Sequence, residues 1–270
     1  MLPVVSSTAA TGSARLPAVA LLGIRLHAIT EAEVVAHVMD ELAAGRGGFV
    51  ATANLDHLRR LQTPGAFRSV YEQATVVVAD GMPLVWACRL QGTPLPGRVA
   101  GSDLIRSLPA GAARAGRSVF LLGGDAGTAD AAAAELVKAS PGLRIAGTAC
   151  PPFGFERDEA RMHDLRRALA AARPDLVFVA LGSPKQELLI AELRSLLPRA
   201  WWVGVGISFS FVSGDVRRAP RWVQRLGIEW LHRLAQEPRR LMVRYLWHGL
   251  PFAAVLFTKA FVARFRRRRS

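Results

Sequence analysis

The stretch Asp175-Leu-Val-Phe-Val-Ala180 decides the fold class. Its apolar residues run consecutively and leave no polar face, which is typical of a strand in a parallel sheet that helices cover on both sides. Thr75-Val-Val-Val-Ala79 repeats the pattern. A strand with one face in water would instead alternate apolar and polar residues. These two runs therefore predict an α/β protein.

Apolar or β-branched runs of this kind alternate with helical patterns along the chain. The predicted strands are residues 22–26, 48–52, 75–79, 118–122, 144–148, 175–180 and 201–205. Helix signals lie between them: a capping-box spacing from Thr30 to Glu33, and helix-forming or periodic stretches over 127–139 and 157–172. This alternation, with short connections, predicts a doubly wound, mostly parallel Rossmann-like sheet.

Charge divides the chain into two parts. The net charge is +14, and residues 217–270 carry +12 of it, with 14 Arg and Lys against two Glu. Residues 1–17 are small, polar and Ala-rich, which predicts a disordered leader. We therefore expect an α/β catalytic domain over 18–216 and a basic helical C-terminal appendage over 217–270. The appendage should meet an anionic partner.

The appendage combines arginines with aromatic and aliphatic residues. Residues 220–248 predict two basic, Trp-bearing helices that break near Pro238, and an apolar stretch over 249–265 ends in Arg266 to Arg269. Such an end is typical of a helix lying on acidic lipid. Nucleic acid is the competing partner, but no binding motif for it is present, so none is expected. No stretch reaches the roughly 18 apolar residues that a bilayer span needs.

Small or polar residues follow five of the predicted strands. In open parallel sheets, ligands bind outside the carboxyl ends of the strands, so these residues mark a candidate crevice. They include Thr52, Asn54, Asp80, Gly123, Gly182, Gln186 and Gly206. Glycine lets a backbone approach a ligand closely, and the coincidence at five ends favours a nucleotide-like ligand.

Motifs for several other chemistries are absent from the sequence. There is no G-x-x-x-x-G-K-[ST] and no G-x-G-x-x-G after the first strand, which argues against P-loop hydrolysis and hydride transfer. There is also no H-E-x-x-H, no Cys/His cluster and no Asp-x-Asp pair, so we expect no metal and no other cofactor. Cys88 and Cys150 are too few for a disulfide framework and suit a reducing compartment.

Asp80 is the leading candidate for catalysis. It could cap a helix that begins at Met82, or act as a general base that is ionised at neutral pH. The residues alone slightly favour the cap. His57 and His232 have no triad partners in the sequence, and we interpret both as structural.

The other candidates also have two interpretations each. Thr52 and Asn54 suit a turn as well as a ligand contact. Arg98 suits a phosphate as well as the neighbouring Asp103. Gln186 is more often a solvated helix residue than a ligand contact, unless its helix begins at the crevice.

Several strings of the chain resemble those of the WecG/TagA/CpsF glycosyltransferase family, in order and over most of the chain. They are Thr52-x-Asn54, Ala79-Asp-Gly-Met-Pro-Leu-Val-Trp86, Arg98-Val-Ala-Gly-Ser-Asp-Leu104, Phe120-Leu-Leu-Gly-Gly124, Leu181-Gly-Ser-Pro-Lys-Gln-Glu187, Arg218-Ala-Pro220, and Glu229-Trp-Leu through Gln236-Glu-Pro-Arg-Arg240. Strings this specific make the resemblance strong.

The resemblance implies an inverting, metal-independent bacterial transferase. Such an enzyme moves a hexose or N-acetylhexosamine, often N-acetylmannosamine, from a UDP-sugar to a polyprenyl-diphosphate-linked acceptor in cell-surface or exopolysaccharide synthesis. It would act as a peripheral protein at the cytoplasmic face of the inner membrane, with its C-terminus on the anionic lipid surface.

The resemblance also assigns roles to residues. The position that matches the catalytic base is Asp80. Those that match the substrate pocket are Thr52, Asn54, Arg98 and Gln186, to which we add the strand-end positions Gly123, Gly182 and Gly206. The appendage would close over the site and bring arginines to the diphosphate; the candidates are Arg233, Arg239 and Arg240.

Two departures from the family pattern stand near the expected substrate. The chain has Phe209-Ser210-Phe211 where the family usually has Phe-Asp-Phe, and Pro96-Gly97-Arg98 where it often has Pro-Glu-Arg. Ser210 is therefore a candidate donor contact without the carboxylate. Either change is compatible with another donor, such as UDP-glucose.

Two rival hypotheses remain from the sequence. One is another nucleotide-cofactor α/β enzyme, such as a methyltransferase or a dehydrogenase, and the other is a non-catalytic peripheral membrane protein. Only the transferase explains Asp80, the polar strand ends and the arginine-rich appendage together. The donor sugar, the acceptor glycan and the oligomeric state, a homo-oligomer included, are left open.

Overall fold

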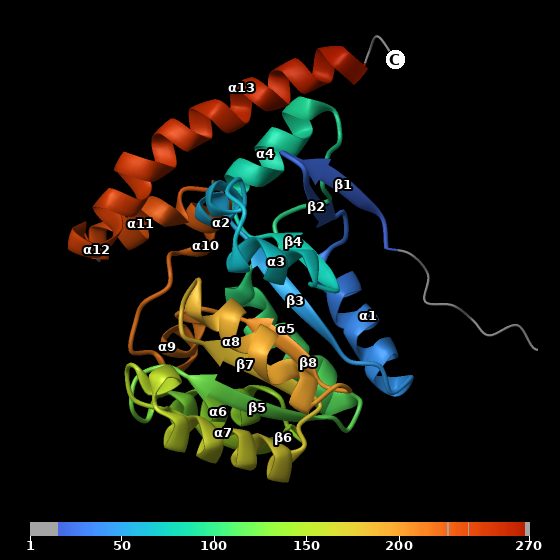
Figure 1. The fold of residues 1–270 in the computed structure, drawn as a ribbon, viewed down its shortest axis with the longest axis vertical. Helices are drawn as coiled ribbons and strands as arrows, with labels where there is room; N and C mark the ends of the chain where they lie inside the picture. Colours follow the sequence, from blue (N-terminus) through green and yellow to red (C-terminus); the bar gives the residue numbers. More distant parts are fainter. Residues whose placement is uncertain (1–15, 226, 237, 268–270) are drawn as a thin grey trace, which may run out of the picture.

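A six-stranded parallel sheet forms the centre of the protein (Figure 1). The computed structural model describes residues 16–225, 227–236 and 238–267. Every neighbouring pair of strands is parallel, in the order β4-β3-β8-β7-β5-β6. The strands are β3 (Gly48–Ala53), β4 (Val76–Ala79), β5 (Ser118–Gly123), β6 (Arg144–Ala149), β7 (Leu176–Ala180) and β8 (Trp201–Gly204). The predicted α/β class is confirmed.

Helices cover both faces of this sheet. One apolar cluster includes residues of α2 (Leu55–Arg60), α3 (Ala66–Glu72), α4 (Met82–Gln91), α7 (Glu159–Ala172) and α8 (Lys185–Leu193). The other includes residues of α1 (Glu31–Ala43), α5 (Gly101–Arg114), α6 (Thr128–Ala139) and α9 (Ser208–Ser213). Along β7, Val177 and Val179 belong to the first cluster, and Leu176 and Phe178 to the second. This alternation explains why the strand has no polar face.

The N-terminal part of the fold differs from the prediction. In place of one strand over 22–26, an antiparallel hairpin pairs β1 (Ala18–Leu21) with β2 (Ile24–His27). Leu22 and Gly23 turn the chain with φ of 49° and 79°, the left-handed conformation that a tight hairpin requires. Leucine rarely adopts it, so Gly23 alone carries a turn signal in the sequence. Pro17, predicted to be part of the leader, accepts a hydrogen bond from Ala28 N–H; residues 1–15 of that leader lie outside the described residues.

The appendage consists of consecutive helices. They are α10 (Arg221–Arg225), α11 (Glu229–Gln236), α12 (Pro238–Met242), a π-helical segment (Val243–Gly249) and α13 (Leu250–Arg267). Pro238 begins α12, near the predicted break, but the described part of residues 220–248 forms four helical segments instead of the two predicted helices. Figure 1 shows α13 lying across α4, and Leu256 and Ala260 of α13 are buried there in the first cluster.

One helix corrects the expectation that no segment is long enough for a membrane span. Helix Tyr245–Arg266, 22 residues long, could cross a bilayer by length and composition alone, and most of it lies at the surface of the protein. The apolar run in the sequence is interrupted at Lys259, whereas the helix continues through that residue.

Candidate active site

Asp80 lies just past β4, at the edge of the sheet where the parallel strands end. Its N–H donates to the carbonyl of Ala53 at 2.7 Å, which holds it beside the end of β3. The helix-cap interpretation of Asp80 is wrong, because Gly81 is the N-cap of α4 and the helix has no side-chain cap. Oδ2 of Asp80 instead faces the N–H of Gly101, the first residue of α5, at 3.5 Å.

The carboxyl group of Asp80 can exchange a proton near neutral pH. Burial raises its pKa from 3.8 to about 6; the charge of Arg98 opposes this shift, that of Glu229 adds to it, the Gly101 N–H opposes it, and the charge of Asp103 adds to it. A general base is most effective when its pKa lies near the operating pH. The site therefore holds a carboxylate suited to accepting a proton.

Arg98 lies between two carboxylates beside Asp80. Its Nη2 is 3.2 Å from Oδ2 of Asp103, so the predicted pairing with Asp103 is present. Its Nη1 is 2.8 Å from Oε2 of Glu229, which belongs to α11 of the appendage. The appendage thus reaches the candidate site through an ion pair.

Thr52 and Asn54 follow one another at the end of β3. Thr52 is buried and lies next to the first residue of α5: its Oγ1 would be 3.5 Å from a Cβ added at Gly101. Asn54 caps α2: its Oδ1 accepts hydrogen bonds from the N–H groups of Asp56 and His57, both at 3.1 Å. Asn54 therefore has a structural role as a helix cap, and the turn interpretation is wrong for Thr52, which lies within β3.

His57 links this cap to a buried tyrosine. Because the oxygen of the Asn54 amide accepts two N–H groups, its nitrogen Nδ2 is the atom that donates to Nε2 of His57, at 3.3 Å. Nδ1 then carries the hydrogen and donates to the hydroxyl of Tyr71 at 2.6 Å. Burial first, and then the charges of Glu187 and Asp80, raise the pKa of Tyr71 well above its usual value. This network agrees with a structural role for His57.

Gln186 is buried, so the solvated interpretation is wrong. Its Oε1 accepts the N–H of Gly206 at 2.9 Å, and its Nε2 donates to Oε1 of Glu187 at 2.8 Å. A Cβ on Gly204 would lie 2.7 Å from Nε2 of Gln186, so a larger residue at position 204 would displace the end of the Gln186 side chain. Gln186 holds the loop after β8 in place.

The remaining strand-end candidates differ in what surrounds them. Only glycine packs well at position 123, since a Cβ added there would lie 2.6 Å from the carbonyl oxygen of Ala180 on β7. At Gly182 and Gly206, with φ of 72° and 58°, an added Cβ would meet no described atom within 4 Å. Ser210 lies in α9, and its carbonyl accepts the N–H of Val216.

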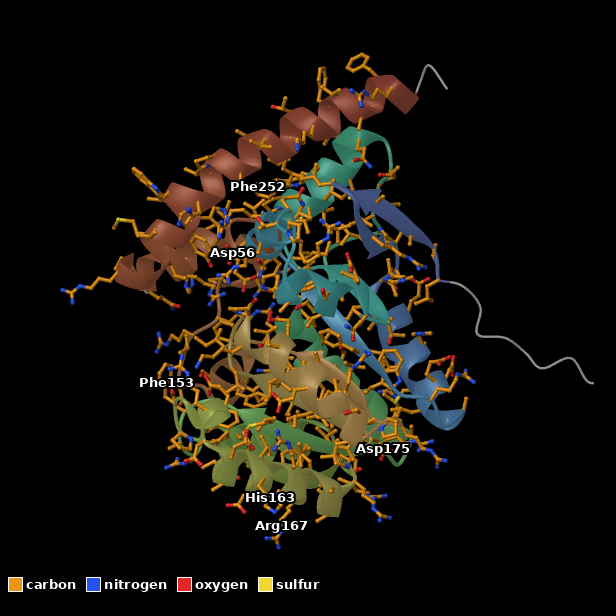
Figure 2. The ribbon with its side chains drawn as sticks, in the orientation of Figure 1. Asp56, Phe153, His163, Arg167, Asp175 and Phe252 are labelled. Carbon is orange, nitrogen blue, oxygen red and sulfur yellow. The ribbon has the colours of Figure 1, made fainter. Side chains whose placement is uncertain are left out.

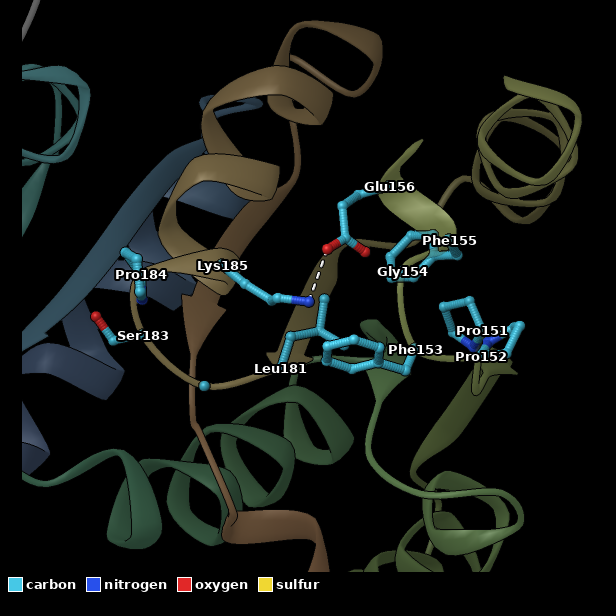
Figure 3. A pocket seen from close by; sticks show the side chains of 11 residues that line it. Pro151, Pro152, Phe153, Gly154, Phe155, Glu156, Leu181, Ser183, Pro184 and Lys185 are labelled. Carbon is cyan, nitrogen blue, oxygen red and sulfur yellow. Dashed lines mark hydrogen bonds and ion pairs between the residues drawn. The ribbon is translucent and has the colours of Figure 1, made fainter. Parts of the chain in front are cut away.

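A cavity of about 340 Å³ lies between the loops that follow β6 and β7. Its wall includes Gly182 and Phe153, and the Phe153 side chain is 96% exposed. Nζ of Lys185 lies 4.1 Å from the centre of the Phe153 ring and 2.6 Å from Oε1 of Glu156 (Figure 3). In Figure 2, Phe153 lies on the opposite side of the domain from Asp175, the residue before β7, so this cavity opens at the carboxyl edge of the sheet.

Gly182 in the wall of this cavity is predicted from the sequence, whereas the segment from Pro151 to Glu156 is not. The run Pro151-Pro-Phe-Gly-Phe155 directly follows β6, and a Pro/Gly turn with an aromatic residue at a strand end is the signal that could have found it.

In the part of the chain that the structure describes, no contact brings the three candidate arginines of the appendage together. Arg233 on α11 is half-buried and Arg239 on α12 is exposed. The side chain of Arg240 lies outside the described residues. Among the described residues, no three His, Cys, Asp or Glu side chains are grouped so that they could hold a metal ion.

Comparison with protein families shows which family the chain belongs to. The family model of the WecG/TagA/CpsF glycosyl transferases matches residues 19–268. The chain belongs to this glycosyltransferase family. The match runs from the hairpin through α13, so the family model covers the appendage of this glycosyltransferase as well as its α/β domain.

Two relatives match this transferase over most of its length. The N-acetylglucosaminyldiphosphoundecaprenol N-acetyl-beta-D-mannosaminyltransferase of Bacillus spizizenii is 38% identical over 201 residues, which cover 74% of this chain and 75% of the relative. The enzyme of the same name from Bacillus subtilis is 32% identical over 194 residues, which cover 72% and 73%. Similarity to these enzymes favours a transferase over a methyltransferase, a dehydrogenase or a non-catalytic protein.

Proposed function

We propose that this transferase moves a hexose or N-acetylhexosamine from a UDP-sugar to a polyprenyl-diphosphate-linked sugar, with inversion and without a metal, in cell-surface or exopolysaccharide synthesis. The observation that carries the proposal is the half-buried Asp80 carboxylate, with a pKa of about 6, at the carboxyl edge of the sheet beside Arg98. The named relatives support an N-acetylglucosaminyl-diphosphoundecaprenol acceptor.

Asp80 would act as the general base. An acceptor hydroxyl gives its proton to Asp80 while its oxygen forms a bond to the anomeric carbon of the donor. The bond from that carbon to UDP breaks on the opposite side, and UDP leaves with the electron pair. The relatives' names specify a β-linked product, which an α-linked nucleotide sugar yields by inversion.

Cationic side chains would stabilise the charge that develops on UDP. Arginine suits a diphosphate because its planar guanidinium makes bidentate contacts. Arg98 lies at the crevice, and Arg233, Arg239 and Arg240 of the appendage are the proposed contacts for the diphosphate. Preorganised charges of this kind are a major source of catalysis in a site that excludes water.

The cavity beside Phe153 is our proposed place for the nucleotide. An exposed aromatic ring can stack on a nucleobase, and the ion pair of Lys185 and Glu156 lies next to it. Gly182, Gly206 and Ser210 lie at or near the same strand ends, where open backbone allows close approach.

We propose that the appendage binds the transferase peripherally to the cytoplasmic face of the inner membrane. One side of α13 packs on α4 through Leu256 and Ala260, whereas Phe261 and Phe265 on the same helix are exposed beside its basic end. A helix with one face on the domain and apolar residues plus arginines outside is suited to an acidic lipid surface.

Turnover with a panel of UDP-hexoses and N-acetylglucosaminyl-diphosphoundecaprenol tests the function. We expect transfer from at least one UDP-sugar, an unchanged rate in excess chelator, and a product whose anomeric configuration is opposite to that of the donor. Thermal shift separates the rivals: UDP should stabilise the protein. Stabilisation by NAD or S-adenosylmethionine without any by UDP would refute the proposal.

A further inference from the structure

The ion pairs of Arg98 belong to a larger arrangement. Arg218, in the segment before α10, places Nη1 2.6 Å from Oδ1 of Asp103 and Nε 3.5 Å from Oε1 of Glu229. Arg98 contacts the other oxygens of the same two carboxylates, at 3.2 Å and 2.8 Å. Two arginines and two carboxylates therefore alternate around a closed ring of Arg98, Asp103, Arg218 and Glu229, which we call the four-residue ring.

The four-residue ring joins the two parts of the protein. Arg98 and Asp103 come from the loop before α5 and from its first turn, while Arg218 and Glu229 come from the appendage. All four side chains are only 15–26% exposed. A single surface ion pair is weakened by water and by side-chain motion, but here each charge has two partners in a sheltered place. The ring is therefore a defined contact between the appendage and the crevice.

The ring also fixes the first turn of α5 and the guanidinium of Arg98, which lie beside Asp80. Nη1 of Arg218 donates to the carbonyl of Ser102 at 3.2 Å, which fixes the first turn of α5. Gly101 in that same turn presents its N–H to Asp80. Both terminal nitrogens of Arg98 are bound by ring carboxylates, so the position of this guanidinium beside Asp80 depends on Glu229 as well as on Asp103.

We propose that Arg218 and Glu229 are positioning residues of the transfer reaction. By completing the ring, they dock the start of the appendage on the crevice and hold Arg98 and the first turn of α5 beside Asp80. The inference rests on the proposed function, in which Asp80 is the base. The groups that shift the pKa of Asp80 come from three places: Arg98 before α5, Gly101 and Asp103 in the first turn of α5, and Glu229 of α11. Glu229 is one of them, and Arg218 contacts both Asp103 and Glu229. Asp80 in turn raises the pKa of Tyr71 on α3.

Hydrogen exchange tests the docking without any need for activity. In the full-length protein, Glu229→Gln and Arg218→Gln should raise the exchange rate of the amides in α11 by about tenfold or more, because local opening becomes easier. Arg166→Gln is the matched control: Arg166 also lies between two carboxylates, Glu159 and Glu192, but on the surface of α7. It should leave α11 unchanged. Unchanged exchange in both ring variants would overturn the docking.

The pH profile of kcat/KM tests the positioning of Asp80. Glu229→Gln removes a negative charge near the base, so the acid limb should move to lower pH by roughly 0.5–1 unit, and the plateau should fall by about tenfold. Arg98→Gln should move the limb to higher pH, and Arg166→Gln should not move it. If the plateau of kcat/KM falls in Glu229→Gln while the acid limb does not move, the positioning role is overturned, whatever the exchange result. Full activity of Asp80→Asn would instead refute the role of Asp80 as the base of the proposed function and leave the exchange result to decide docking.

Discussion

The α/β domain and the appendage use the same apolar residue types in opposite ways. In the domain, alternate strand residues are buried in clusters on both faces of the sheet. In the appendage, Trp222, Val243, Trp247 and Phe261 are each at least 50% exposed. Exposed apolar surface of this kind marks an interaction site, here combined with a strong positive charge. The difference supports the proposal that the appendage, rather than the α/β domain, contacts the membrane.

The largest expected effect separates chemistry from membrane contact. Asp80→Asn keeps the shape of the side chain but cannot accept the proton, so turnover should fall at least about a hundredfold, within the range for a general base. The measurement is the initial rate with saturating donor and acceptor. Binding to acidic vesicles should stay unchanged, because Asp80 lies in the domain.

Asp164→Asn is the matched control for this change, since Asp164 is an exposed carboxylate on α7. It should retain normal turnover, and circular dichroism should give the same spectrum for both variants. Near-normal turnover of Asp80→Asn would remove this residue from the mechanism.

Most of the domain could be predicted from the sequence, for physical reasons that particular residues illustrate. Strands such as β4 and β7 are apolar on both faces, and a short run of this kind is typical of a parallel strand that helices cover on both sides. Asp80 could be placed at the carboxyl edge because the end of a parallel strand fixes the edge at which the next residue lies. The Leu22-Gly23 turn could not be predicted, because leucine carries no signal for a positive φ.

The features that could not be predicted depend on contacts between distant parts of the chain. Arg98 and Glu229 are 131 residues apart, and no local pattern indicates that they meet. Phe153 is exposed, so it contributes nothing to the periodicity from which buried elements are predicted. The burial of Gln186 depends on Gly204 and Gly206 of another strand end, which a helix pattern alone cannot reveal.

The next effect concerns the appendage alone. Removal of residues 250–270 deletes α13 and its basic end, so affinity for vesicles of phosphatidylglycerol and phosphatidylethanolamine should fall by at least about thirtyfold, since each cation near the surface contributes about 1 kcal/mol. Sedimentation with vesicles measures the loss. The remaining binding should be less sensitive to salt than that of the full chain.

A gentler variant keeps α13 on the domain. Phe261→Ser combined with Phe265→Ser changes only exposed rings and leaves the buried Leu256 and Ala260 in contact with α4. It should weaken vesicle binding while UDP still stabilises the protein. Vesicle binding that survives both variants would contradict the division of roles between the two parts.

A smaller effect returns to the domain and tests the proposed nucleotide cavity. Phe153→Ala removes the exposed ring, so the KM for the UDP-sugar should rise by about fivefold or more, because stacking of a base on an aromatic ring contributes about 1–3 kcal/mol. Phe153→Tyr keeps the ring and should restore the KM. Vesicle binding should be unaffected. An unchanged KM in Phe153→Ala would move the nucleotide away from this cavity.

The smallest effect is thermodynamic and concerns the carboxylate that the domain keeps half-buried. Folding raises the pKa of Asp80 from 3.8 to about 6, so the folded state favours the protonated acid. Its contribution to the free energy of unfolding is fully present below pH 4 and is lost as the pH rises through about 6. Asp80→Asn does not ionise, so at pH 7.5 its Tm should exceed that of the native protein by about 2–5 °C, an advantage that shrinks toward pH 4. Asp40→Asn, at an exposed position of α1, should show no such trend in thermal unfolding. If Asp80→Asn is less stable than the native protein at pH 7.5, the ionised Asp80 stabilises the fold. The base would then not lower the stability of the domain.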